Sequence, residues 1–223
     1  MNRCFTLVSL FFFVYLPCWA ANSPDSTMER EIASIERDFD AAKYGNLSAE
    51  ARTSALESLL RRTDSLQTQN PARAEPLVWR SWVLCEYAVV LHSLRSFKLL
   101  QEAREKLEAA LSIDPLVYGA EAYATLGSLY TTLPGFPLSF GDLTKGRRYL
   151  DKALAIDPNG TQQNLSYGNL LFKSRDYSGA MKYALAALDA PRRDGRESAD
   201  NDLHTQAQQL LDKLRAKLKV RSL

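Results

Sequence analysis

One amphipathic helix pattern occurs three times in this sequence and ends each time at a proline. The three copies are AREKLEAALSIDP (103–115), GRRYLDKALAIDP (146–158) and AMKYALAALDAP (180–191). The second and third copies begin at Gly146 and Ala180, 34 positions apart, and end at Pro158 and Pro191, 33 positions apart. Because a fixed period of this length is typical of stacked helical hairpins, the sequence predicts a chain built of repeated helix pairs.

The segment before the second copy has the pattern of a matching first helix. Tyr123 is followed by Leu126, Gly127 and Tyr130, so aromatic, apolar and small residues recur at helical spacing. Residues 164–171 form a weaker copy of the same pattern. Small side chains allow two helix backbones to cross closely, and the paired helices carry them at Gly127, Gly168, Gly146 and Ala180.

Apolar residues recur at helical spacing from residue 25 onward, and no segment shows the alternation typical of a strand. We therefore expect an all-α protein, a right-handed solenoid of about four helical hairpins with a C-terminal capping helix. The expected helices cover residues 27–43, 48–68, 75–94, 97–112, 117–131, 143–156, 160–173, 177–189 and 199–219. The expected parts are a divergent hairpin (21–74), repeats (75–191) with a loop insertion at 132–142, and a linker with the capping helix (192–223).

The N-terminal segment has the pattern of a cleaved secretory signal. Arg3 supplies a positive start, residues 5–16 are apolar, and Cys18 and Ala20 place small residues where signal cleavage is determined. The apolar run ends at Pro17 and is shorter than the roughly 20 residues of a membrane-spanning helix. We expect removal of residues 1–20 and a periplasmic mature chain without a membrane span, and lipid attachment at Cys18 is the less favoured alternative.

Charge and cysteine content narrow the class of partner and fold. The formal net charge is +2, which gives no electrostatic reason to expect a nucleic-acid partner. Removal of the signal leaves Cys85 as the sole cysteine, so no internal disulfide is expected. Because Cys85 lies in the apolar stretch WRSWVLCEYAVVL, we interpret it as a buried small hydrophobic residue.

Residue patterns that carry enzyme or metal chemistry are not found in the sequence. His92 and His204 are its two histidines, and neither belongs to a motif with metal-ligand spacing. Gly135 and Gly141 lack the Lys and Ser/Thr of a phosphate-binding loop, and no nucleophile elbow occurs. We expect a non-enzymatic protein without a metal or cofactor, with His92 at a helix end and Asp142 as a helix N-cap.

The loop insertion at 132–142 contains PGFPLSFG and makes its hairpin about eight residues longer than the next one. Its aromatic residues Phe136 and Phe140 are too apolar to be exposed together without a reason. One interpretation is that they fold back over their own hairpin. The other is that the loop forms a wall of an apolar groove or an edge that a partner contacts.

A basic turn, PRRDGRE, separates the last repeat from the capping helix. It contains Arg192, Arg193 and Arg196. One interpretation is an exposed loop that Asp194 and Glu197 partly neutralise. The other is a site whose guanidinium groups pair with the carboxylates of a partner.

Several segments together resemble secreted bacterial tetratricopeptide-repeat proteins. The resemblance covers about residues 75–215 and rests on Trp79, 103–115, 122–130, the 134–142 loop, 157–160 and 190–196. More distantly, the chain looks like the tetratricopeptide component associated with periplasmic TRAP transporters, which in that family partners a solute-binding protein. The first helix of the fourth hairpin departs from the family pattern through the polar Gln162 and Gln163. The resemblance implies a periplasmic scaffold that binds a protein partner or a hydrophobic small molecule.

We predict a protein-protein interaction scaffold whose partner binds the concave face formed by the first helices, together with the loop. The alternative is a binder of a small hydrophobic ligand, or an accessory component of a transport system. Tyr123 and Tyr130 have packing within the hairpin as a second interpretation. The candidate partner-binding residues are Tyr123, Tyr130, Phe136, Phe140, Asn164, Tyr167, Arg192, Arg193 and Arg196.

Overall fold

The computed structural model describes residues 24–221, and every regular element in that range is an α-helix. The helices are α1 (Pro24–Tyr44), α2 (Ala49–Gln69), α3 (Glu75–Leu91), α4 (Arg95–Ile113), α5 (Ala120–Thr132), α6 (Leu143–Ile156), α7 (Thr161–Lys173), α8 (Tyr177–Asp189) and α9 (Glu197–Arg221). The prediction of an all-α protein is confirmed. The predicted signal segment, residues 1–20, lies outside the described residues.

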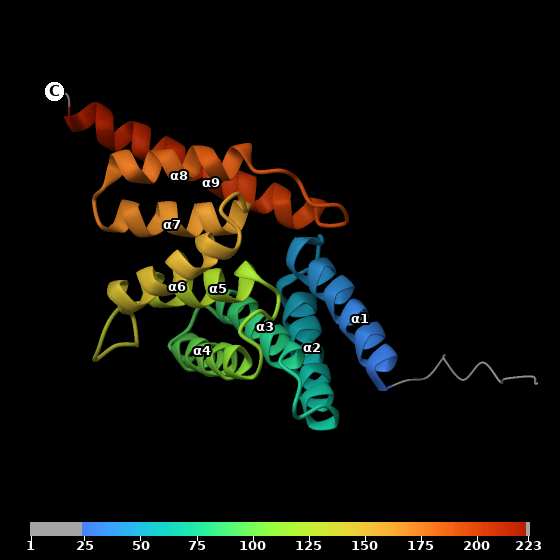
Figure 1. Ribbon diagram of the computed structural model, residues 1–223. Coiled ribbons are helices and arrows are strands. Elements are labelled where there is room, and N and C mark those ends of the chain that lie inside the picture. Colours follow the sequence, from blue (N-terminus) through green and yellow to red (C-terminus); the bar gives the residue numbers. More distant parts are fainter. Residues whose placement is uncertain (1–23, 222–223) are drawn as a thin grey trace, which may run out of the picture.

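Neighbouring helices pair in the order of the sequence, as Figure 1 shows from the blue to the orange part of the chain. The pairs α3 with α4, α5 with α6, and α7 with α8 make the most extensive contacts, and α1 with α2 form a looser first pair. The first helices α5 and α7 also pack against each other. One side of the molecule is therefore formed by the first helices of successive pairs.

The α5–α6 pair shows why the repeat pattern contains glycines. A Cβ atom added to Gly127 would lie 2.6 Å from Cγ of Leu150 and 3.1 Å from the carbonyl oxygen of Gly146. At Gly146, an added Cβ would overlap the methyl group of Thr131. The two backbones thus approach too closely for a side chain at either position, as the sequence pattern predicts.

Two helix boundaries differ from the prediction because of left-handed backbone conformations. The helix expected to reach residue 94 ends at Leu91, since His92 adopts φ 42°. The helix expected from residue 117 begins at Ala120, since Tyr118 and Gly119 have φ values of 49° and 55°. Neither conformation can continue a right-handed helix. His92 does lie at a helix end, as predicted.

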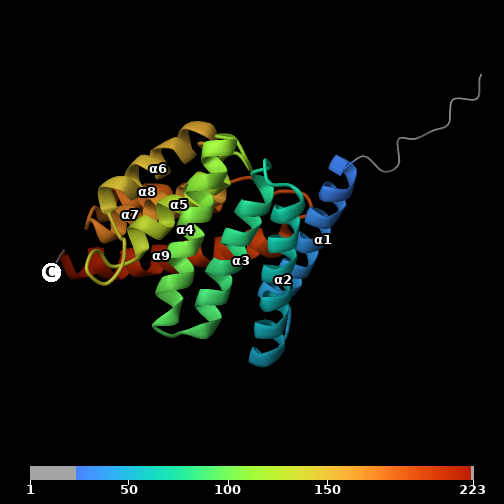
Figure 2. The same cartoon turned by 90° about the horizontal axis from the view of Figure 1, so that it is seen from below.

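The last helix, α9, begins close to α1 and then runs along α7 and α8 toward its C-terminal end (Figure 1). Its apolar side packs in a core cluster with α7 and α8 through Ala207, Leu210, Leu211 and Leu214. Figure 2 shows α9 running crosswise to α1, α2 and α3. Because the beginning of α9 also contacts α1, the first and last described helices meet, and a groove lies beside their contact.

Candidate functional site

That groove has a volume of about 500 Å³, and we call it the central groove. All five odd-numbered helices, α1, α3, α5, α7 and α9, contribute to it, with one residue from α4 and two from the linker before α9. The lining residues are Leu100 and residues within 39–44, 79–89, 121–133, 162–169 and 193–206. No single repeat forms this site, since its walls come from helices far apart in the sequence.

Aromatic rings from α1 and α3 form one wall of the central groove. Trp79 packs edge-on against Phe39 and Trp82, with ring centroids 5.8 and 5.0 Å apart. The indole N–H of Trp79 donates to the hydroxyl of Tyr118 at 2.7 Å, and that of Trp82 donates to Oγ1 of Thr125 at 3.2 Å. The wall is therefore apolar, and both indoles are held by hydrogen bonds.

Hydroxyl and amide groups of α5 and α7 form a second wall, which adjoins the aromatic one where Trp82 bonds Thr125. Gln162 donates to Oγ1 of Thr125 at 3.2 Å, and the hydroxyls of Ser128 and Ser166 lie 2.8 Å apart. Asn169 continues this row and is exposed to the groove. Such side chains both donate and accept, so this wall is able to hydrogen-bond a peptide backbone.

Three cations line the groove, and each faces two carboxylates. Arg193 in the linker pairs with Glu121 of α5 and donates to Asp200 of α9 through Nε at 3.0 Å and Nη2 at 2.6 Å. The backbone N–H of Arg193 donates to the same carboxylate at 2.7 Å. Burial opposes the ionisation of Asp200, but the bonds from Arg193 hold its pKa below the usual value. This first set ties α9 to α5.

The second cation, Arg196, lies immediately before α9 and faces α1. Its guanidinium pairs with the carboxylate of Glu36 and also interacts electrostatically with Asp40. Burial raises the pKa of Asp40, and Arg196 offsets only part of that effect. The second set therefore holds α9 against α1.

The third cation, Lys43 of α1, lies inside the groove with its Nζ 3.9 Å from the carboxylate of Glu86. Nζ also lies 5.2 Å from the ring centre of Tyr44. Burial opposes the protonated form of Lys43, yet Tyr44, Glu86 and Asp202 together raise its pKa above the usual value. Burial also raises the pKa of Glu86, which Lys43 and Arg52 lower only in part.

Of the nine predicted site residues, the structure places Arg193 and Arg196 in the central groove. Tyr123 and Tyr130 instead stack on Tyr149 of α6, with centroids 6.4 and 5.7 Å apart. The Tyr130 hydroxyl donates to Glu108 of α4 at 2.7 Å. Packing within the hairpin, the second interpretation, accounts for both tyrosines.

Three further predicted residues also lie away from the groove. Asn164 is buried and donates to the carbonyl oxygens of Pro158 and Gly160, both at 2.9 Å, so it holds the turn before α7. Tyr167 packs on Tyr183, and its hydroxyl accepts from Arg147 at 2.9 Å. Separately, the guanidinium of Arg192 donates to the side chain of Asn201 at 2.6 Å.

The two phenylalanines of the 133–142 loop have different environments. Phe140 packs edge-on against Tyr130 at 5.4 Å, and Arg104 lies over its ring at 4.7 Å. Phe136 is 94% exposed. Asp142 holds the base of the loop, because its backbone N–H donates to the carbonyl oxygen of Tyr130. Its side chain caps α6, as predicted. The loop therefore folds back at its base and presents Phe136 to solvent.

Sequence reasoning missed most of the groove. The signal that points to it is a row of polar residues at helical spacing on each first helix, on the side opposite the apolar positions. On α5 this row contains Thr125, Ser128 and Thr132, and on α7 it contains Gln162, Ser166 and Asn169. The acidic residues Glu86 and Asp202 have no comparable repeat signal.

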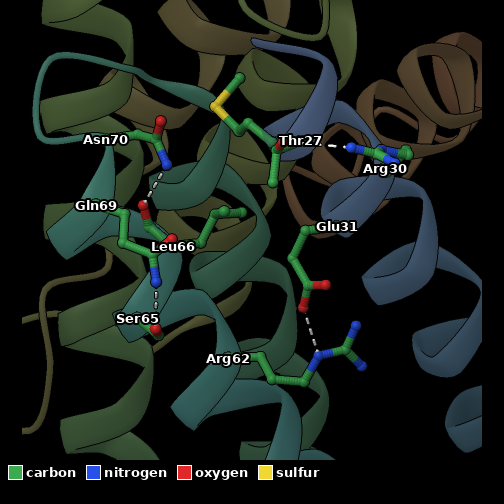
Figure 3. Close-up of a pocket in the computed structure, with 9 residues that line it drawn as sticks. Thr27, Arg30, Glu31, Arg62, Ser65, Leu66, Gln69 and Asn70 are labelled. Atoms are coloured by element: carbon green, nitrogen blue, oxygen red, sulfur yellow. Dashed lines mark hydrogen bonds and ion pairs between the residues drawn. The ribbon is translucent and has the colours of Figure 1, made fainter. Parts of the chain in front are cut away.

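A second cleft, of about 680 Å³, lies between α1 and α2 (Figure 3). Arg62 points across it, donating to Glu31 at 2.8 Å and to Ser34 at 2.9 Å. Asn70 donates to the carbonyl oxygen of Leu66 at 2.9 Å. Its polar groups are largely paired with one another, and the described residues that line it include no aromatic side chain, so this cleft offers a ligand less than the central groove does.

No protein-family model matches this chain, and no curated protein matches it. Within residues 24–221, no cluster of three or more His, Cys, Asp or Glu side chains is arranged to hold a metal ion. No helix in that part of the chain has the length and hydrophobicity required to cross a membrane.

Proposed function

We propose that this protein is a non-enzymatic periplasmic scaffold, built of tetratricopeptide-like repeats, that binds an extended segment of a protein partner. The observation that carries the proposal is the central groove, where helices from the whole described chain converge on one hollow. Its volume of about 500 Å³ lies within the roughly 300–1,000 Å³ typical of ligand sites. The repeat period and the N-terminal signal pattern support the class of scaffold and its compartment.

The two walls of the groove suit the two parts of a peptide. The aromatic wall offers the partly exposed Trp82 to apolar side chains, and the adjoining wall offers hydroxyls and amides to the backbone. An extended segment exposes unpaired N–H and C=O groups along its length, and Gln162 and Asn169 are placed to bond them. This combination favours a polypeptide over a purely apolar ligand.

The second candidate function is binding of a small hydrophobic molecule, alone or as an accessory of a transport system. The aromatic cluster of Phe39, Trp79 and the partly exposed Trp82 favours it. Native mass spectrometry separates the two candidates, because a small ligand retained through purification adds a discrete mass that denaturation removes. A purified protein of unmodified mass argues for the peptide-binding function.

The direct test is crosslinking in intact cells from a photoreactive residue at position 162, on the groove wall. Position 185 on α8 is the matched control, because Leu185 is exposed but does not line the groove. We expect a discrete protein adduct from position 162 that position 185 does not give and that Asn169→Arg abolishes. A third probe at position 136 reports whether the loop contacts the same partner.

The proposal is wrong if the probe at position 162 gives no protein adduct while circular dichroism shows normal helix content. It is equally wrong if positions 162 and 185 give the same adducts, because the contact is then independent of the groove.

A further inference from the structure

We infer that a cleft at the start of α5 and α7 binds an uncharged saccharide. This cleft, which we call the first-turn cleft, has a volume of about 340 Å³. It is lined by residues within 118–121 and 156–163, together with Pro191 and Arg193. A saccharide here is a second ligand, separate from the partner segment of the proposed function.

Two buried polar side chains of α7 line this cleft without a hydrogen-bond partner. Thr161 is 6% exposed and Gln163 is 3% exposed, and neither side chain bonds another described residue. A buried hydroxyl or amide that stays unpaired lowers the stability of a fold. A ligand that bonds both groups removes that cost, so the two side chains are the first indication of a binding site.

The first turn of α7 adds backbone donors beside these side chains. Its N-cap residue, Gly160, supplies no side-chain cap. The backbone N–H of Asn164 donates to the carbonyl oxygen of Gly160 at 3.1 Å, whereas the N–H groups of residues 161–163 donate to no described residue. The first N–H groups of a helix lack partners inside it and point out of its end. They are therefore available to the oxygen atoms of a ligand.

Two acceptor oxygens lie together beside those donors. A Cβ atom added to Gly160 would overlap both Oε1 of Gln163 and Oδ2 of Asp157, so these oxygens converge over the glycine. Asp157 uses its other oxygen, Oδ1, to accept from the backbone N–H of Asn159 at 3.2 Å. Neighbouring donors and acceptors suit a hydroxyl group, because a hydroxyl both donates and accepts.

The charges around the cleft favour an uncharged ligand. The N-terminus of a helix carries partial positive charge, which disfavours a cation. Glu121 and Asp157 line the cleft and disfavour an anion. Arg193, the one cation among the described lining residues, is already paired with Glu121 and Asp200. A ligand rich in hydroxyl groups and without net charge is complementary to this surface.

Apolar side chains supply the remaining part of the lining. Tyr118 is half-buried and Ile156 is 40% exposed, and both line the cleft. A sugar ring carries C–H groups on its faces and hydroxyls around its rim, so it contacts apolar and polar groups at once. The volume of about 340 Å³ lies at the lower end of the roughly 300–1,000 Å³ typical of ligand sites, which suits a monosaccharide or the end of a longer chain.

The test is a nuclear magnetic resonance titration of the protein labelled with isotopic glycine. Gly119 and Gly160 line the cleft, whereas Gly45 and Gly179 do not. The neutral probes are glucose, galactose and N-acetylglucosamine, and glucuronate and glucosamine are the anionic and cationic controls. We expect at least one neutral sugar to shift the amide signals of Gly119 and Gly160 saturably, and both charged sugars to bind about tenfold more weakly than it does.

A double variant tests the two unpaired side chains. Thr161→Val with Gln163→Met should abolish the shifts without lowering the midpoint of urea unfolding, because no hydrogen bond within the protein is lost. Thr144→Val with Gln101→Met is the matched control and should keep the shifts, because neither residue lines the cleft.

A single variant tests the same site without changing a polar group. Gly160→Ala should abolish the shift at Gly119, since its methyl group displaces Gln163 and Asp157. The backbone accepts alanine there, because φ is −70°. Circular dichroism checks that each variant retains the helix content of the parent chain.

Each result decides the matter differently. Absence of a saturable shift with all three neutral sugars overturns the inference. Tighter binding of glucuronate or glucosamine overturns the uncharged class of ligand. Equal shifts at Gly45 and Gly179 show that the sugars act on the whole surface, and they overturn the site. Binding that survives both Gly160→Ala and the double variant overturns the assignment to the first turn of α7.

Discussion

The guanidinium of Arg196 pairs with the carboxylate of Glu36, which lies 160 positions earlier in the chain. Glu36 belongs to α1, and Arg196 directly precedes α9, so this pair joins the first and last described helices. Among the described residues, no core cluster contains side chains from both helices. The contact that closes the central groove is therefore mainly electrostatic.

We predict that Arg196→Met loosens this closure without unfolding the protein. Methionine keeps part of the aliphatic stem but removes the charge, and a partly exposed ion pair contributes at most about 1 kcal/mol. Hydrogen exchange should become faster in α1 and in the first turns of α9, while the helix content stays the same. Arg215→Met is the control, because the Arg215–Asp212 pair lies within α9. Unchanged exchange in both helices contradicts the prediction.

Gly127→Ala should destabilise the α5–α6 hairpin. The added Cβ would overlap Leu150 and approach the Gly146 carbonyl, and overpacking of this kind costs about 1–3 kcal/mol. Gly168→Ala is the comparison, since its nearest neighbour, the flexible end of Leu210, lies at 3.1 Å and is able to move. Urea unfolding measures both changes. Equal midpoints for the two variants would show that the helices separate easily at residue 127.

The two phenylalanines of the loop should contribute differently to the free energy of unfolding. Phe140→Ala removes contacts with Tyr130 and Arg104 and should lower the free energy of unfolding by about 2 kcal/mol, less than for a fully buried phenylalanine. Phe136→Ala should change it by no more than about 0.5 kcal/mol, because the ring is 94% exposed. Thermal unfolding tests both variants. A large loss of stability in Phe136→Ala would contradict the exposed position of this ring.

Cys85 should react with iodoacetamide at pH 8 much more slowly in the folded chain than in denaturant. Cys85 is half-buried at the wall of the central groove rather than fully buried as the sequence predicts. The burial of its thiol still raises the pKa from 9.0 to about 12, so the reactive thiolate is scarce below that range. The neutral thiol is the form that the fold favours. Its contribution to stability is therefore complete below pH 9 and is lost as the pH rises toward about 12.

Comparison with Cys85→Ala isolates the effect of the thiol on stability. The difference in unfolding free energy between the two proteins should shrink as the pH rises through that window. Alkylation is measured on the chain without residues 1–20, in which Cys85 is the sole cysteine. A fast reaction of the folded chain at pH 8 would refute the prediction.

Local features of this fold were predictable from the sequence because they depend on neighbouring residues. Helical spacing located the helices to within a few residues, and the cap at Asp142 and the close approach at Gly127 follow from residue type. The boundaries at His92 and Tyr118 were missed, since a left-handed conformation at a residue other than glycine has little sequence signal.

The site was less predictable because its parts come from distant helices. Tyr123 and Tyr130 have the spacing of a helix face, but spacing alone does not tell whether that face meets the second helix or the groove. The structure places them against Tyr149. The pairing of Arg196 with Glu36 has no periodic signal at all, and the closure of the groove depends on it and on similar contacts.

The meeting of α1 and α9 also constrains how this chain can change in length. An open stack of hairpins tolerates the gain or loss of a unit, because each unit contacts only its neighbours. Here an inserted hairpin between α4 and α7 would move Arg196 away from Glu36 and separate the walls that α3 and α9 contribute. The contact between α1 and α9 thus constrains the number of helices between them, and duplication of a repeat there would abolish the site rather than extend it.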